Sequence, residues 1–174
     1  MSRKKSAALP TAYVVLRILI VLNWVYAACL IALLSFSFIN EPFLMRALGL
    51  SSLANNPALT IGVRAIAALG ILAVPLNLAM LNRLIAMVHT VRDGDPFVAA
   101  NAYRINAIAW ILLGLQVIGL VIWGIGKAVS TPEHPLHLDA GFSPAGWLSV
   151  VLSFVLARVF AEGTMMREDL EGTI

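Results

Sequence analysis

The run INAIAWILLGLQVIGLVIWGIG, residues 105–126, contains no Asp, Glu, Lys or Arg and lies between Arg104 and Lys127. An α-helix needs roughly 20 apolar residues to cross a hydrocarbon core about 30 Å thick. Working outward, the chain has three further charge-free runs, at residues 18–40, 65–82 and 140–157. We therefore predict an all-α fold, an integral membrane four-helix bundle with spans at about 14–39, 58–82, 105–126 and 144–161.

The composition agrees with a membrane protein. Charged residues make up 12% of the 174 positions, whereas a soluble domain carries about 25%. Little chain remains outside the four runs, so residues 1–174 are expected to form a single membrane domain, with the lipid bilayer as its surroundings. The basic start resembles a signal peptide, but its apolar run exceeds the 7–15 residues of a secretory core. An uncleaved first span is the expectation.

Proline after a capping residue indicates where three of the helices begin. Asn56-Pro57, Asp95-Pro96 and Ser143-Pro144 each combine a side-chain acceptor with a proline suited to the first helical position. We predict that Asp95 is an N-cap, that Pro96 begins the third helix and that Gly94 makes the preceding turn. A metal site at Asp93 and Asp95 is the weaker alternative, because further oxygen ligands are absent nearby.

A second helix from Pro57 to about Val91 would be much longer than a bilayer requires. Residues 83–104 are therefore predicted to form a helical hairpin outside the membrane. With the amino terminus inside, nine Lys and Arg residues lie inside and three outside, which favours cytoplasmic termini and a cytoplasmic hairpin. The nine are Arg3, Lys4, Lys5, Arg17, Arg83, Arg92, Arg104, Arg158 and Arg167, and the three are Arg46, Arg64 and Lys127.

This bias predicts a multi-pass protein of the bacterial cytoplasmic (inner) membrane. We attribute the net charge of +3 to the same asymmetry and to anionic lipid headgroups, and expect no direct binding of nucleic acid.

Four polar residues lie within the predicted spans: Asn23, Arg64, Asn77 and Gln116. Hydrogen bonds between helices explain the three amides, and an anchor at the membrane interface explains Arg64. Pro75 is expected to free a carbonyl that a neighbouring side chain binds. The alternative is a solute path lined by the amides.

Metal and catalytic sites are not indicated. His134 and His137, with Glu133 and Asp139, are interpreted as a solvated outer loop in preference to a metal site, because Pro135 separates the histidines and no helix is expected there. The sequence has no recognisable nucleophile–base pair and no phosphate-binding glycine loop. We expect a non-enzymatic protein without a cofactor.

Two stretches carry a resemblance to a known family. The first comprises Gly94, Asp95, Pro96 and Phe97 followed by Asn101 and Arg104, and the second comprises Phe160, Glu162, Gly163, Arg167, Glu168, Asp169, Thr173 and Ile174. With these residues the chain resembles the bacterial DUF2975 family of small four-span membrane proteins of unknown function. Tyr103 departs from the pattern, where a smaller or basic residue is expected. The resemblance implies, as a companion, a small cytoplasmic helix-turn-helix regulator encoded beside the protein.

Both stretches fall on the predicted cytoplasmic side. We expect Arg104 to pair with Glu162, Glu168 or Asp169, either to tie helix ends together or to form a docking surface. The predicted function is a non-enzymatic interaction or regulatory module that engages a cytoplasmic partner through residues 83–104 and 158–174. A small channel or transporter component is the alternative, and a homo-oligomer is compatible with both.

Overall fold

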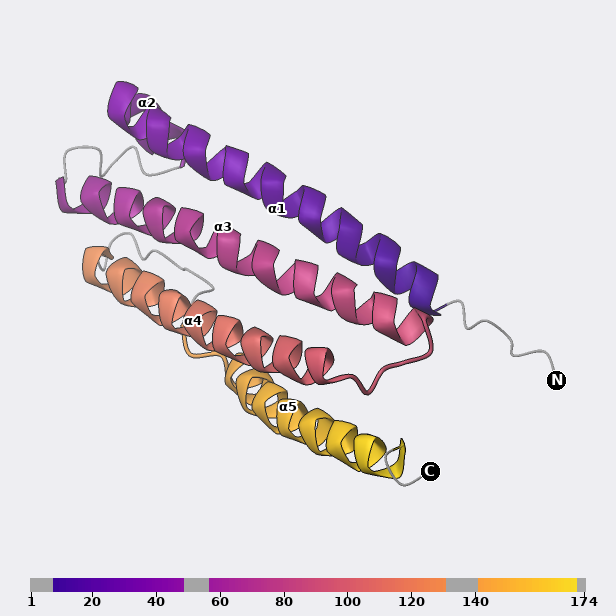
Figure 1. Cartoon of the computed structure of the whole chain (residues 1–174). Coiled ribbons are helices and arrows are strands. Elements are labelled where there is room, and N and C mark those ends of the chain that lie inside the picture. The colour runs from indigo at the N-terminus through magenta and orange to yellow at the C-terminus, as the bar shows by residue number, and fades with distance from the viewer. Residues whose placement is uncertain (1–7, 49–56, 131–140, 172–174) are drawn as a thin grey trace. The chain divides into compact units, whose positions relative to one another are not determined.

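The computed structural model describes residues 8–48, 57–130 and 141–171, and over these ranges the chain is helical, without a strand (Figure 1). Its helices are α1 (Ala8–Ile39), α2 (Glu41–Ala47), α3 (Pro57–Arg92), α4 (Ala99–Val129) and α5 (Pro144–Glu171). Four of these, α1, α3, α4 and α5, are long and apolar enough to cross a membrane. The predicted all-α fold is confirmed, with four helices that have the length and composition of membrane spans.

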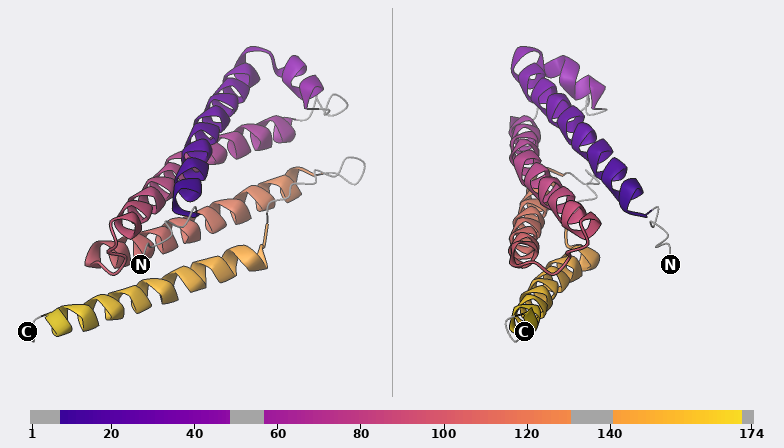
Figure 2. Two further views of the ribbon diagram at one scale, coloured as in Figure 1. Left: turned by 90° about the vertical axis from the view of Figure 1, so that its right-hand side faces the viewer. Right: turned by 45° about the vertical axis from the view of Figure 1, so that its right-hand side comes forward.

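The long helices exceed the thickness of a bilayer. α3 has 36 residues, which at 1.5 Å per residue is about 54 Å, against a hydrocarbon core of about 30 Å. The other three have 32, 31 and 28 residues. Each helix therefore has more length than a perpendicular crossing needs, and each runs without a break (Figure 2).

The described residues group into two compact units. The first unit takes its residues from 1–22, 77–113 and 144–174, and the second from 23–76 and 114–143. Each has its own buried apolar side chains. They are Leu81, Ile105, Ile108, Ala109, Val150 and Ala157 in the first unit, and Ala27, Leu44, Met45, Leu59, Ala67 and Val74 in the second.

Many large apolar side chains are exposed along the helices. Val14, Ile18 and Val21 of α1, and Leu152 and Val155 of α5, are each more than half exposed. Contiguous apolar surface of this kind is rare on soluble proteins, but it is the expected surface of a helix in lipid.

Proline predicts two helix starts correctly. α3 begins at Pro57 and α5 at Pro144, while Asn56 lies outside the described residues. The short helix α2 was not predicted. Its N-cap is Asn40, whose Oδ1 accepts a hydrogen bond from the Phe43 amide at 3.2 Å. Pro42 lies in its first turn, so α2 begins by the same local chemistry.

Candidate functional site

The connection between α3 and α4 begins with a helix-ending turn at Gly94. Gly94 has a φ of +89°, and its amide donates to the Val91 carbonyl at 3.2 Å. The Asp95 amide donates to the Thr90 carbonyl at 3.0 Å. These two bonds define a Schellman motif, in which a left-handed residue satisfies the last carbonyls of the helix. The predicted turn at Gly94 is confirmed.

The predicted N-cap at Asp95 is wrong, and so is the predicted helix start at Pro96. α4 begins at Ala99, and residues 95–98 are not helical. The Asp95 carboxylate instead accepts a hydrogen bond from Nη1 of Arg167 on α5, which makes an ion pair. The Asp95 carboxylate therefore binds Arg167, which is distant in the sequence, and does not cap the start of the helix.

Phe97 packs against α5 beside this ion pair. Its ring centroid lies 5.2 Å from that of Phe160. A Cβ atom on Gly163 would lie 3.2 Å from Cδ1 of Phe97, which is tighter than ordinary van der Waals contact. Glycine at position 163 therefore lets the Phe97 ring lie close to the backbone of α5.

Asn101 ties the connection to α3 and to α4. It is completely buried, and its Nδ2 donates to Oγ1 of Thr90 at 2.7 Å and to the Pro96 carbonyl at 2.9 Å. Its Oδ1 accepts from Nη1 of Arg104 at 2.7 Å. The predicted placement of Asn101 and Arg104 on one helical face is confirmed. The Asn101 amide, which is buried and makes three hydrogen bonds, stabilises the fold at this position.

The predicted pairing of Arg104 with Glu162 is wrong. Nε of Arg158 donates to Oε1 of Glu162 at 2.7 Å, four positions along the same helix. Neighbours at this spacing meet without any tertiary requirement, so the local pair forms. Arg104 makes no ion pair with any acidic side chain that the structure describes, Asp169 included, and the side chain of Glu168 lies outside the described residues.

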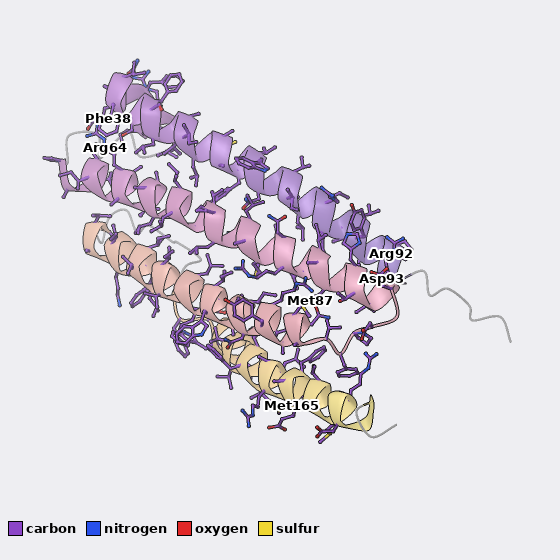
Figure 3. All side chains as sticks on the ribbon, in the orientation of Figure 1. Phe38, Arg64, Met87, Arg92, Asp93 and Met165 are labelled. Carbon is purple, nitrogen blue, oxygen red and sulfur yellow. The ribbon has the colours of Figure 1, made fainter. Side chains whose placement is uncertain are left out.

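The two sequence stretches thus meet within the first unit. We call the ion pair of Asp95 with Arg167, the packing of Phe97 on Phe160 and Gly163, and the Asn101 bonds together the tip cluster. Figure 3 shows Arg92 and Asp93 at the end of α3, and Met165 on α5. Thr173 and Ile174 of the second stretch lie outside the described residues.

The second unit contains a polar cluster around Arg64. Nε of Arg64 donates to Oγ of Ser37 at 2.7 Å, and Nη2 donates to the Ser37 carbonyl at 2.6 Å. Nη2 also lies 3.5 Å from Oε2 of Glu41, whose Oε1 accepts from Thr60 at 2.6 Å. The Phe38 ring lies 4.4 Å from the guanidinium carbon (Figure 3).

This cluster gives Arg64 a more specific role than an interface anchor. Ser37 is in the last turn of α1, where carbonyl groups lack helical donors, and a guanidinium supplies them.

One of the three amides in the spans makes the expected inter-helix bond. Asn23 is buried and its Nδ2 donates to the Val74 carbonyl at 3.3 Å. Pro75 deprives the Ile71 carbonyl of its helical donor. Asn23 binds the carbonyl of Val74, the residue before Pro75, and not the freed carbonyl of Ile71. The side-chain amides of Asn77 and Gln116 make no hydrogen bond to a described residue.

No group of three or more His, Cys, Asp or Glu side chains that could hold a metal ion occurs in residues 8–48, 57–130 and 141–171. The predicted site at Glu133, His134, His137 and Asp139 lies outside the described residues.

The fold defines a helical multi-pass membrane protein. The family model described as protein of unknown function (DUF2975) matches residues 56–174. The match covers more than half of the chain and includes every residue of the tip cluster, so the chain belongs to this family. No significant match was found among the curated proteins or among the solved structures.

Proposed function

We propose that this protein is a non-enzymatic, membrane-bound interaction module that holds a soluble cytoplasmic partner at the end of α3 and the end of α5. The observation that carries the proposal is the tip cluster. Two segments separated by about seventy positions are joined by an ion pair and an aromatic contact, and the buried Asn101 amide fixes the first segment to the end of α3. Such contacts hold the loop and α5 in one arrangement, which preorganises the surface around them for binding.

The residues of the tip cluster bind one another, so we assign the docking of the partner to their exposed neighbours. Arg92 and Asp93 are exposed at the end of α3. Met165 and Met166 on α5 are 52% and 67% exposed. Methionine side chains adapt to different partners, and exposed apolar surface beside charged residues is typical of interaction sites.

Asn101 is not a docking residue in this proposal, although the sequence made it a candidate. Its amide is buried and bonded on both ends, so a substitution there would alter folding as well as binding.

Transport receives less support. The proposed solute path depended on Asn23, Asn77 and Gln116, and the first of these is buried with its amide on a backbone carbonyl. No specific observation favours a path between the spans.

A pull-down from detergent-solubilised membranes tests the proposal. We expect the wild-type chain to retain a soluble protein in stoichiometric amount, and Arg92→Glu and Met166→Glu to lose it. The matched control is Arg46→Glu, because Arg46 is also an exposed arginine in the last turn of a helix, α2. Retention by all three variants, or equal loss from all three, would contradict the proposed surface.

A further inference from the structure

A groove of about 410 Å³ lies between the beginning of α4 and the middle of α5, within the first unit. Its walls are apolar and mostly small, formed by Ala102, Ala157, Ala161 and Phe154. Small side chains on two adjacent helices leave room that a slender apolar chain can fill.

Three polar side chains line the same groove: Tyr103, Asn106 and Arg158. All three are exposed, Tyr103 to 75%. A guanidinium carries five N–H donors; Arg158 uses Nε for Glu162 and makes no other hydrogen bond to a described residue. The Tyr103 hydroxyl and the Asn106 amide make none to the described part of the chain. The groove therefore combines apolar walls with unused donors.

The position of the groove along the helices identifies its surroundings. The charge-free run of α4 begins directly after Arg104, and that of α5 ends directly before Arg158. Phe154 and Ala157 thus belong to the charge-free run of α5, whereas Arg158 and Ala161 lie beyond it. The charge-free runs of α4 and α5 both end at the level of the groove. The groove therefore lies where the acyl chains of a bilayer meet the phosphate groups.

We propose that this groove binds one anionic phospholipid, with an acyl chain along Phe154 and Ala157, the glycerol beside Ala161 and the phosphodiester at Arg158 and Tyr103. Glu162 does not prevent this, because its carboxylate occupies Nε and leaves the two terminal nitrogens of Arg158 to an anion. A free phosphate would leave the apolar walls uncovered. A zwitterionic lipid would gain less from the guanidinium. The inference needs only the membrane location and does not depend on the proposed partner.

The test is native mass spectrometry of the full chain in detergent, titrated with dioleoyl phosphatidylglycerol or dioleoyl phosphatidylcholine. We expect the wild type to retain one phosphatidylglycerol at a roughly fivefold lower lipid concentration than phosphatidylcholine, as one cation near a headgroup gives. Arg158→Gln should remove this preference, and Arg92→Gln, an exposed arginine outside the groove, should keep it.

A second pair of variants tests the apolar walls. Ala161→Leu fills the groove and should weaken retention of both lipids, whereas Ala128→Leu, at an exposed position near the other end of α4, should not. Ala102→Leu gives a second filling variant if Ala161→Leu lowers the folded yield. Glycerol 3-phosphate at millimolar concentration should not displace the lipid. Equal retention of the two lipids, equal loss from Arg158→Gln and Arg92→Gln, or displacement by glycerol 3-phosphate would overturn the proposal.

Discussion

Arg167 on α5 forms an ion pair with Asp95 in the connection between α3 and α4, across 72 positions of sequence. This contact joins the two segments that carry the family resemblance. It also accounts for the start of α4 at Ala99, because the Asp95 carboxylate is directed to α5 and does not cap a helix.

Asp95→Asn is expected to lower the free energy of unfolding by about 0.5–1 kcal/mol, since the paired side chains are 42% and 44% exposed and solvent screens the pair. The double exchange Asp95→Arg with Arg167→Asp should recover most of the loss. Thermal unfolding in detergent measures both, with Asp93→Asn as the control at an exposed neighbouring carboxylate. If Asp95→Asn were as silent as Asp93→Asn, Asp95 would have no structural ion pair.

Asn101→Leu is expected to cost about 2–3 kcal/mol, because it leaves the half-buried partners Thr90, Pro96 and Arg104 without their bonds to the buried amide. Thr90→Val removes only one of these bonds and should cost about 1 kcal/mol. Asn106→Leu, at an exposed amide of the same helix, is the control for chemical denaturation in detergent. A loss at Asn106 as large as that at Asn101 would show that the buried amide has no special role.

Gly94→Ala should destabilise the chain by about 1 kcal/mol, since a φ of +89° is unfavourable for a residue with a Cβ atom. No atom lies within 4 Å of the added methyl group, so the cost is conformational and not steric. Gly94→Asn should cost less. The control is Gly119→Ala within α4, where space is also open and alanine favours the helix. Equal melting temperatures for the Gly94→Ala and Gly119→Ala variants would contradict the turn.

Arg64→Gln should destabilise the second unit by about 1–2 kcal/mol, because the Ser37 carbonyl and Glu41 lose a charged donor in a partly exposed cluster. Arg64→Lys should recover little of this, since a compact ammonium does not reproduce the planar fork whose Nε and Nη2 reach the hydroxyl and the carbonyl of Ser37. Unfolding of Arg46→Gln, an exposed arginine on α2, provides the comparison. A lysine variant as stable as the wild type would contradict the two-point contact.

The sequence predicts the long helices well and their tertiary contacts poorly. Charge-free runs and proline locate α3 and α5, because span length and the first helical position are local properties. The same local pattern fails at Asp95, whose partner Arg167 is remote in sequence. Likewise, nothing in the sequence near Arg64 indicates that Ser37, at the end of the preceding long helix, is its partner. Tertiary pairing of this kind needs the helices in place.

In the tip cluster, too, the local features were predicted and a side-chain partner was not. The turn at Gly94 and the shared face of Asn101 and Arg104 follow from helix geometry and were predicted. The partner of Glu162 was not predicted, although the spacing of four positions between Arg158 and Glu162 on one helix favours the local pair over Arg104. The local pair is the one that forms.

The proposed docking of a cytoplasmic partner requires the tip cluster to face the cytoplasm. Labelling with a membrane-impermeant maleimide, in a Cys29→Ser background, tests this most directly, with Asp93→Cys beside the tip cluster and Ser130→Cys just beyond the end of α4. From the nine-to-three distribution of Lys and Arg we predict that Asp93→Cys reacts only in inverted vesicles and Ser130→Cys only in intact spheroplasts. Labelling of Asp93→Cys from outside the spheroplasts would contradict the predicted orientation, and with it the docking of a cytoplasmic partner.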